Sequence, residues 1–306
     1  MISVVVSFKN SNATAINCLR TTLRTFQQLG STSIEFILID DKSDPEQNIP
    51  QLMAEFRSQV PSGVRVLEFL FKEHQHYTRA LAYGFSAAKG KQILFVSHDM
   101  LLTPAYVRGV LAVAAADATI GLVRGTSPYV DCFPQHKVVP PFALRSYDDV
   151  DDFADYVSAY WGLQWVEDRL LTGDSMLIKR EVIDKIGVFD PRYFGYFGDI
   201  DFGLRLQRAG FKMVCAKGAW LWHEGAAAYK DKAQQTQQQY ATIHAARMQV
   251  VNNAYLAFRD KWDSSLPPVY PGTDAIPLEA LRRRPPLPGG EYQPPITPDV
   301  SICEIR

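Results

Sequence analysis

The sequence Ile2-Ser-Val-Val-Val-Ser-Phe8 is a short apolar run rich in β-branched residues, as is typical of a buried strand. Comparable runs recur along the first part of the chain, and longer segments with helical spacing separate them. The strand-like runs are 2–8, 34–40, 64–70 and 92–97, and the helical segments are 14–29, 45–58, 77–89 and 104–116. Strands that alternate with helices require crossover connections, which pair the strands in parallel. We therefore predict an α/β fold with a Rossmann-like, mostly parallel sheet flanked by helices.

The composition is that of an ordinary globular protein. Of the 306 residues, 47% are hydrophobic and 21% are charged, which excludes fibrous and disordered classes. The 32 Lys and Arg residues nearly balance the 33 Asp and Glu residues, so the net charge of −1 gives no electrostatic basis for binding nucleic acid. The four cysteines are widely spaced, and we predict that they are reduced: Cys18, Cys132, Cys215 and Cys303.

The sequence also bears on location. No basic leader precedes the first apolar run, and no run approaches the roughly 18 apolar residues that a membrane span needs. We therefore expect a cytoplasmic protein. Peripheral contact with the inner face of the membrane is left open, because such contact needs only an amphipathic face or a basic patch such as Arg282-Arg-Arg284.

The alternation lapses after Ile120-Gly-Leu-Val-Arg-Gly125. We assign the acidic, aromatic segment from Tyr147 to Tyr156 to irregular structure on the carboxyl edge of the sheet, where open α/β sheets bind ligands. Ten of the 19 prolines lie in residues 265–306, so we expect an extended tail or linker there. Between these two regions the pattern returns as strand-like runs at 175–178 and 212–216 and as helical segments near 181, at 199–209 and at 232–262.

Carboxylates follow three of the predicted elements. Asp40 and Asp41 end one strand, Asp99 follows another, and Asp199 and Asp201 lie near a helix start. Each place also has an ordinary structural explanation, which is a turn after a strand for the first two and N-capping for the third. Because the carboxyl ends of parallel strands meet at one edge of a sheet, we expect these acids to converge there.

Five segments together resemble the family 2 glycosyltransferases, which are inverting enzymes of the GT-A fold. The segments are Ser3–Asn10, Ile39–Asp44, Ala87–Asp99, Gly173–Asp190 and Phe197–Gly210, and the block from Gly173 to His223 is the most specific. The resemblance implies a three-part organisation. Residues 1–125 are the nucleotide-sugar-binding half, residues 126–264 the acceptor-binding and catalytic half with a C-terminal helix, and residues 265–306 a proline-rich extended tail.

On the donor side, the resemblance assigns the nucleotide base to Asp41. A carboxylate there accepts the imide N–H of uracil or thymine, or the N–H pair of guanine, and reads cytosine poorly. UDP- and dTDP-sugars are therefore the favoured donors, and a GDP-sugar is a further option. Arg79 is either a diphosphate or base-side contact or a solvent-facing helix arginine. By family position, the base and ribose are lined by Ser7, Phe8 and Asn10.

The family's metal motif is usually Asp-x-Asp, and here it reads Ser97-His98-Asp99. The resemblance implies that Asp99 holds Mn²⁺ or Mg²⁺ against the diphosphate of the donor, and the middle position of His98 favours manganese. His223 matches a family histidine that often completes the metal shell. The alternative for His223 is a strand-end histidine hydrogen-bonded to a carbonyl.

On the acceptor side, Asp199 matches the family's general base, the second residue of a Glu-Asp pair, while Gly198 replaces the Glu. Asp201 is a candidate to orient that base. Trp161, Trp165 and Asp174 are candidates for contacts with a glycan or lipid-linked glycan acceptor, although each type is more often found in a core or on an ordinary surface.

Three functions are weighed on these residues. The first is a metal-dependent inverting glycosyltransferase. The second is a catalytically weak GT-A-like module for nucleotide-sugar binding or interaction, suggested by the departures at Ser97, Tyr83 and Gly198. The third, a sugar-nucleotide pyrophosphorylase, is disfavoured because residues 7–12 contain no glycine to cradle a triphosphate. A homodimer is left open, because the proline-rich tail can cross to a second copy as easily as it can fold back.

Overall fold

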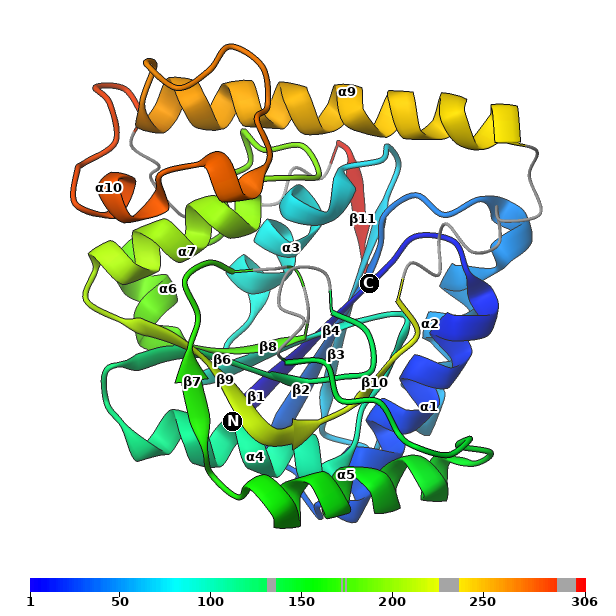
Figure 1. The fold of residues 1–306 in the computed structure, drawn as a ribbon. Coiled ribbons are helices and arrows are strands. Elements are labelled where there is room, and N and C mark those ends of the chain that lie inside the picture. The colour runs from blue at the N-terminus through cyan, green and yellow to red at the C-terminus, as the bar shows by residue number, and fades with distance from the viewer. Residues whose placement is uncertain (131–135, 172, 174, 226–236, 291–300) are drawn as a thin grey trace.

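The computed structural model describes residues 1–130, 136–171, 173, 175–225, 237–290 and 301–306. These residues form a nine-stranded sheet in the order β11-β3-β2-β1-β4-β8-β6-β9-β7 (Figure 1). The strands are β1 Ile2–Phe8, β2 Ile34–Asp40, β3 Arg65–Phe71, β4 Gln92–Ser97, β6 Ile120–Thr126, β7 Trp165–Glu167, β8 Met176–Lys179, β9 Lys212–Trp220 and β11 Cys303–Ile305. Strands β3, β2, β1 and β4 pair in parallel, and so do β6 and β9, whereas β8 pairs antiparallel with both β4 and β6.

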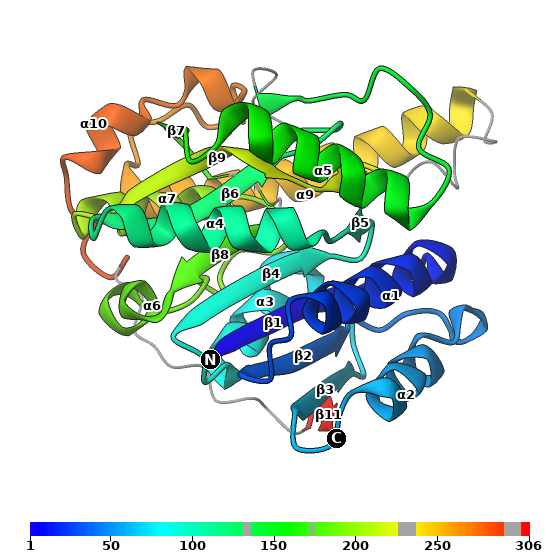
Figure 2. The ribbon, with the colours of Figure 1, turned by 90° about the horizontal axis from the view of Figure 1, so that it is seen from below.

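Helices cover both faces of this sheet, as Figure 2 shows. The helices are α1 Asn12–Gln28, α2 Ile49–Gln59, α3 His76–Ala87, α4 Pro104–Ala116, α5 Tyr147–Trp161, α6 Arg180–Ile186, α7 Gly198–Arg208, α9 Gln237–Trp262 and α10 Leu278–Arg282. One core lies under α1, α2 and α4, and a second core lies under α3, α6 and α7. The predicted α/β fold with a mostly parallel, doubly covered sheet is confirmed.

Strand β1 illustrates why the first apolar run decides this fold. Val4, Val6 and Phe8 belong to the core under α1, α2 and α4, whereas Val5 belongs to the core under α3. Because successive side chains of a strand point to opposite faces, a strand that is buried on both faces must be apolar throughout. The run 2–8 therefore predicts a central strand, and β1 does lie between β2 and β4.

Helix α3 packs unusually close to the sheet at Gly84. A Cβ atom at this position would lie 2.7 Å from Ile39 Cδ1 and 2.9 Å from Val5 Cγ1. A side chain at residue 84 would therefore push the helix away from β1 and β2. The close contact holds the first turn of α3 near the carboxyl ends of these strands.

The segment from Tyr147 to Tyr156 is helical, and the expectation of irregular structure there was wrong. Its N-cap is a capping box, in which the Ser146 side chain accepts from the Asp149 amide and the Asp149 side chain accepts from the Ser146 amide. The acids of the first turn also favour a helix start. The apolar residues then follow helical spacing and are buried: Val150, Phe153, Ala154 and Val157.

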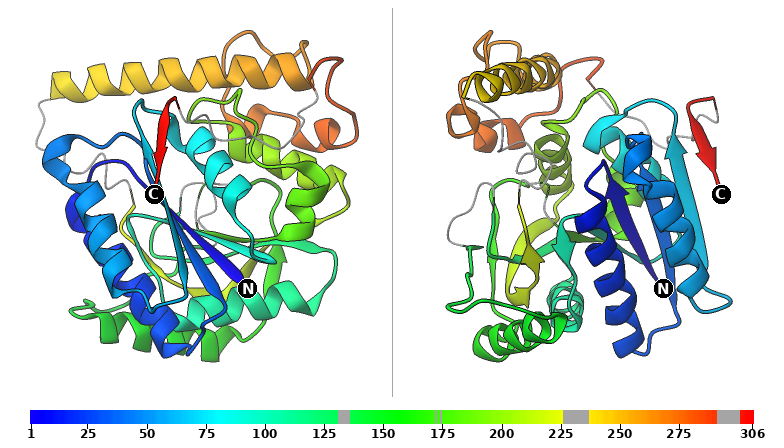
Figure 3. Two further views of the ribbon diagram at one scale, coloured as in Figure 1. Left: turned by 180° about the vertical axis from the view of Figure 1, so that it is seen from behind. Right: turned by 90° about the vertical axis from the view of Figure 1, so that its right-hand side faces the viewer.

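The described parts of the C-terminal region pack on the same chain. Leu266, Ile276, Leu278 and Leu281 form a core cluster with residues of α7 and α9. Strand β11 then pairs antiparallel with β3 and completes that edge of the sheet, as Figure 3 shows. The tail therefore contains a short helix and a strand, in addition to its extended segments.

Two further predictions concern cysteines and membrane spans. Cys18, Cys215 and Cys303 are buried free thiols, whereas Cys132 lies outside the described residues. Burial raises the pKa of the Cys18 thiol to about 12, which keeps it protonated. Within the described part of the chain, we find no helix whose length and hydropathy would let it cross a bilayer.

Candidate donor and catalytic site

Strands β1, β2 and β4 end at the same edge of the sheet. In the strand register Ser7 lies opposite both Ile39 and Ser97, and Phe8 lies opposite Asp40. The residues that follow each strand are Asn10, Asp41 and Asp99, so three loops with polar side chains leave the same edge of the sheet. Of the acids that were expected to converge, Asp40, Asp41 and Asp99 lie at or directly after strands that end at this edge.

Asp41 is buried and firmly held. Its Oδ1 accepts a hydrogen bond of 2.6 Å from the Gln75 amide, and its Oδ2 lies 2.8 Å from Nδ1 of His74. Its own amide donates to the Phe8 carbonyl at 2.9 Å. Asp40 differs from its neighbour, because its Oδ1 accepts from the Ser43 amide at 2.9 Å and so closes a turn. Asp41 is thus the carboxylate that is fixed toward the β3–α3 loop.

Three aromatic rings pack together beside Asp41. The His74 and His76 ring centroids lie 3.9 Å apart, and the His76 and Phe194 centroids lie 3.8 Å apart. Burial, and secondly the neighbouring His74, lower the pKa of His76 to about 4. The sequence analysis did not predict this cluster, although the pattern His-Gln-His lies in the loop after β3. The three rings join the β3–α3 loop to the loop that precedes α7.

Arg79 strengthens the same connection. Its Nε donates to the Pro191 carbonyl at 2.7 Å, and its guanidinium lies 5.4 Å from the centroid of the Phe194 ring. The side chain is half-buried, so Arg79 is not a freely solvated helix arginine. In this structure it ties α3 to the loop before α7.

The residues predicted to line the base and ribose have different environments. Phe8 is fully buried in the core, so only its backbone reaches the edge, whereas Ser7 is half-buried. Asn10 has a φ of +59° and exchanges hydrogen bonds with Asp44, in which Asn10 Nδ2 donates to the carboxylate at 2.9 Å and the Asp44 amide donates to Asn10 Oδ1 at 2.8 Å. Asn10 therefore shapes the loop between β1 and α1.

Asp99 and His223 meet through a small second sheet. Strand β5 Met100–Leu101 pairs with β10 Trp222–His223, and the Glu224 amide donates to the Asp99 carbonyl at 3.0 Å. The Oδ2 of Asp99 lies 3.4 Å from His223 Nε2, and Ser97 Oγ donates to Oδ1 at 2.8 Å. Burial alone would raise the pKa of Asp99, but His223, His98 and Ser97 together hold it well below its usual range.

The two ring nitrogens of His223 have different neighbours. Its Nδ1 lies 3.1 Å from the Tyr129 carbonyl, while Nε2 faces Asp99. A hydrogen bond from Nδ1 to a carbonyl leaves Nε2 as the acceptor or ligand atom. The expected strand-end contact and an orientation suited to a metal ligand therefore occur in the same side chain.

These residues fit a divalent cation that is shared with a diphosphate. Mg²⁺ and Mn²⁺ at such sites take one or two protein ligands and complete their shell with phosphate oxygens and water. Within the described residues no group of three His, Cys, Asp or Glu side chains is poised around one metal position. Asp99 and His223 supply two ligand atoms, and His98 lies beside them with a buried Nε2 that has no hydrogen-bond partner in the described structure.

Asp199 lies in the first turn of α7, half-buried, and its Oδ1 accepts from the Ile200 amide at 2.9 Å. The residue before it is Gly198, and the structure leaves no room for an acidic side chain at that position. A Cβ atom at residue 198 would lie 2.3 Å from Thr78 Cγ2, so Thr78 of α3 occupies the space of a side chain. Asp199 is therefore the half-buried carboxylate of this turn, whereas Asp201 is fully buried.

Asp201 lies in the core and not on an open acceptor face. It is fully buried, and Lys261 Nζ lies 2.6 Å from its Oδ1. Trp262 Nε1 and the Tyr193 hydroxyl donate to Oδ1 at 2.9 and 3.1 Å, and Arg205 Nε donates to Oδ2 at 2.8 Å. Asp201 thus anchors α7 to α9, which is a structural role that sequence spacing alone did not reveal.

Three acceptor-side candidates remain, namely Trp161, Trp165 and Asp174. Trp165 begins β7, and the Lys212 ammonium lies 5.7 Å from the centroid of its ring. Trp161 ends α5, and the Lys217 ammonium lies 4.5 Å from the centroid of the Trp161 ring. The first turn of α5 contacts α1, because the Tyr147 hydroxyl donates to Asn17 Oδ1 at 2.6 Å. Asp174 lies outside the described residues.

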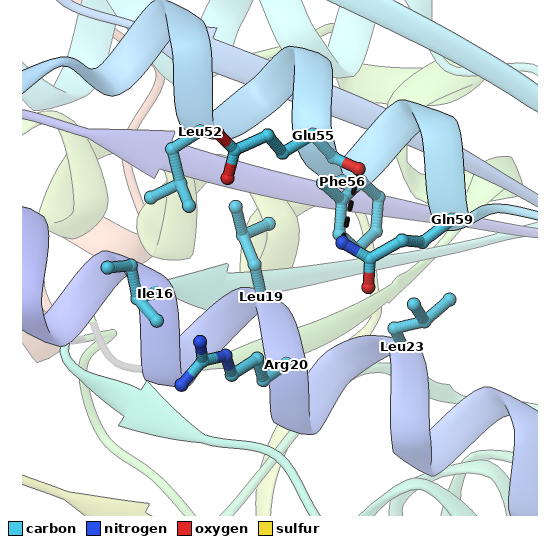
Figure 4. A pocket seen from close by; sticks show the side chains of 8 residues that line it. All are labelled: Ile16, Leu19, Arg20, Leu23, Leu52, Glu55, Phe56 and Gln59. Carbon is cyan, nitrogen blue, oxygen red and sulfur yellow. Dashed lines mark hydrogen bonds between the residues drawn. The ribbon is translucent and has the colours of Figure 1, made fainter.

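A hollow between α1 and α2 lies apart from these residues. Figure 4 shows its lining, which includes Leu19 and Leu23 of α1 and Phe56 and Gln59 of α2. Its volume of about 90 Å³ is far below the roughly 300 Å³ or more of typical ligand pockets. We interpret it as a seam in the packing of two helices.

The fold and the acids at its edge define a class of protein, the glycosyltransferases of the GT-A fold. Residues 2–242 match the family described as glycosyltransferase like family 2, and the chain belongs to this family. A shorter match, 39% identical over 56 residues, is to N-acetylglucosaminyl-diphospho-decaprenol L-rhamnosyltransferase of Mycobacterium tuberculosis. The match spans 18% of this chain and 18% of the length of that curated relative.

Solved structures with a similar fold include a mannosyltransferase. The mannosyltransferase PcManGT of Pyrobaculum calidifontis, in complex with GDP-Man and Mn²⁺, has a TM-score of 0.52 and 16% identity over 92% of this chain and 77% of its own. GalNAc-T7 with UDP, GalNAc and Mn²⁺ has a TM-score of 0.53 and 15% identity over 73% and 43%. TarS of S. aureus has a TM-score of 0.52 and 12% identity over 84% and 71%. At these identities the similarity shows the fold alone.

Proposed function

We propose that the protein transfers a sugar from a nucleotide diphosphate donor to a hydroxyl of a glycan or lipid-linked glycan, with inversion at the anomeric carbon. The observation that supports this proposal is that Asp41 and the Asp99–His223 pair follow strands that end at one edge of the sheet, and that Gly198, next to Asp199, packs against Thr78 in the first turn of α3. Family membership supports it, and so do the nucleotides and Mn²⁺ bound in two solved structures of similar fold.

Donor selection would depend on Asp41. Its carboxylate is held by His74 and by the Gln75 amide, and each carboxylate oxygen has a second lone pair that can accept an N–H from a base. Uracil, thymine and guanine offer such an N–H beside a carbonyl. Cytosine does not, so a CDP-sugar is the least suitable donor.

Asp99 and His223 would hold Mn²⁺ or Mg²⁺ at the diphosphate. When bound, the cation would supply Lewis-acid neutralisation of the negative charge on the leaving diphosphate. The low pKa of Asp99 keeps its carboxylate ionised and ready to act as a ligand throughout the neutral range. His98, whose buried Nε2 lacks a partner in the described structure, would face the donor from the same side.

Asp199 would act as the general base. Its carboxylate would accept the proton of the acceptor hydroxyl as the hydroxyl oxygen attacks the anomeric carbon. The bond from that carbon to the diphosphate oxygen would break on the opposite face, and the diphosphate would leave with the electron pair. Such a single displacement inverts the anomeric configuration.

The first experiment is a calorimetric titration with UDP, dTDP, GDP and CDP, each with Mn²⁺ and with EDTA. We expect selective binding that needs Mn²⁺, with CDP the weakest ligand. Asp41→Asn should reduce the selectivity among nucleotides, and Asp99→Asn should reduce the dependence on metal. If none of the four nucleotides binds the wild-type protein, the donor site is assigned incorrectly.

A second candidate is a catalytically weak GT-A-like module that binds a nucleotide sugar or a partner. It is favoured by Ser97, which stands where the family motif has an acid and donates to Asp99 instead of supplying another carboxylate. Tight binding of nucleotide sugars, without donor hydrolysis or transfer to any acceptor tried, would favour this candidate over the transferase.

A further inference from the structure

The outer face of α5 carries large aromatic side chains that are exposed to solvent. Tyr156 and Tyr160 are 63% and 66% exposed, and Phe142, from the segment before the helix, is 58% exposed. Exposed groups of this kind usually mark an interaction site. We call this surface the α5 platform and define it by Pro141, Phe142, Asp149, Asp152, Tyr156 and Tyr160.

The rings of the platform are ordered. The Tyr156 and Tyr160 centroids lie 6.4 Å apart with an interplanar angle of 25°, because the two residues are one helical turn apart. Phe153 is buried beneath them and fixes their neighbours, with centroid distances of 5.9 Å to Phe142 and 6.0 Å to Tyr156. The exposed rings are therefore held in place by a packed ring below.

A hollow opens between the helix and the segment before it. Its volume is about 480 Å³, within the range of pockets for small molecules. Its lining combines apolar and acidic side chains: Pro141, Phe142, Asp149, Asp152, Phe153 and Tyr156. Asp152 is exposed and pairs with no cation in the described part of the structure, so its carboxylate can accept hydrogen bonds from a ligand.

This chemistry matches carbohydrate. The C–H faces of a sugar ring pack against aromatic faces, and sugar hydroxyls donate to carboxylates. The acidic side chains repel anionic ligands such as nucleic acids and acidic lipid headgroups. A chain of uncharged sugars fits both the stacked rings and the acceptor oxygens.

We propose that the α5 platform binds a carbohydrate chain, namely the acceptor glycan, away from the transfer site. This inference rests on the proposed function. The first turn of α5 contacts α1 through Tyr147 and Asn17, and the Trp161 end of the helix lies against Lys217 of β9. Helix α5 packs on α4 and β9, and the platform lies on its outer face.

The test is affinity electrophoresis of the full chain in gels that contain dextran, laminarin, yeast mannan, hydroxyethylcellulose or alginate. We expect at least one neutral polysaccharide to retard the wild-type protein. The Tyr156→Ala/Tyr160→Ala double variant should bind about tenfold more weakly, because it loses two stacking rings. Tyr160→Phe keeps its ring and should be retarded like the wild type.

The controls separate this proposal from its alternatives. Val269→Ala removes a side chain that is 65% exposed elsewhere and should change nothing. The affinity for UDP or GDP with Mn²⁺ should be the same in all variants. A wild-type protein that binds glycan but no nucleotide would refute the proposed function without contradicting glycan binding by the platform. No retardation by any of the five polysaccharides, or equal retardation of the double variant, overturns the proposal. A dimer by light scattering that the double variant dissociates also overturns it, because the rings would then bind a second copy.

Discussion

Asp199 is the residue on which the proposed chemistry depends most directly. Asp199→Asn keeps the size of the side chain and removes its basicity, so we expect transfer to fall by about a thousandfold. Donor binding should remain unchanged, because the substitution leaves Asp41 and Asp99 in place. Single-turnover transfer and nucleotide titration measure the two quantities, and Asp184→Asn, on the exposed side of α6, is the matched control. Full turnover in Asp199→Asn would show that another group accepts the proton.

His76 should make the stability of the protein depend on pH. Its pKa is about 4 in the folded protein against 6.5 ordinarily, so the unfolded chain binds a proton between these values and the folded chain does not. Stability is therefore complete above pH 6.5 and falls as the pH drops toward 4. We expect this histidine to account for about 2 kcal/mol of the loss, a value already reduced for its partial exposure.

Urea unfolding at pH 7 and pH 4.5 measures this effect. His76→Gln should lose about 2 kcal/mol less between the two pH values than the wild type. His244→Gln, an exposed position on α9, should behave like the wild type. Equal losses in all three proteins would show that His76 titrates normally.

For single residues, the sequence predicted a position correctly where the residues that indicate it are neighbours in the chain. Asp41, Asp99 and His223 lie at strand ends within short motifs, and the structure places each of them at the edge of the sheet. The role of Asp201 could not be predicted, because its partner Lys261 is distant in the chain. Long-range pairing of charges leaves no periodic trace in a sequence.

Among the elements, α7 and α9 are joined by a buried charge cluster. The Lys261 ammonium lies 2.8 Å from Asp190 Oδ2 and 2.6 Å from Asp201 Oδ1, and all three side chains are buried. Burial alone would raise the pKa of Asp190, but Arg192 and Lys261 lower it. The cluster holds both ends of the segment that precedes and begins α7.

We expect Lys261→Met to lower the free energy of unfolding by about 3–5 kcal/mol, because it leaves two buried carboxylates without their shared cation. Adding Asp190→Asn should recover part of that loss, since one of the two carboxylates that lost the Lys261 ammonium is then neutral. Urea unfolding measures both. Lys185→Met, whose ammonium reaches only the Ala209 carbonyl and the Phe211 ring, is the control. A loss below about 1 kcal/mol in Lys261→Met would contradict this account.

Helix α5 shows what a pattern at this scale can hide. The sequence Ser146-x-x-Asp149 before apolar residues at helical spacing is a capping box, and it was available in the sequence. The density of acids and four prolines before the helix suggested irregular structure instead, and these prolines are Pro128, Pro134, Pro140 and Pro141. The acids are compatible with a helix. Asp148 and Asp149 lie in its first turn, and Asp148 and Asp151 pair with Arg24 of α1.

For the whole molecule, the residues after Ser264 are part of the fold. They supply Leu266, Ile276, Leu278 and Leu281 to a core cluster and β11 to the edge of β3. A chain truncated after Ser264 would expose both, so we expect lower stability and concentration-dependent association. Thermal unfolding and light scattering against the full chain measure these effects. Unchanged stability and mass would mean that the tail adds nothing to the body.

Strand β8 has a consequence for how quickly this protein folds. Its four residues pair with β4 on one side and with β6 on the other, so these two strands share no backbone hydrogen bonds with each other. Both partners lie far back in the chain, and closing such long loops is the slow part of assembling a sheet. The two halves of the sheet are therefore joined only when this short strand from the middle of the chain has been inserted between β4 and β6.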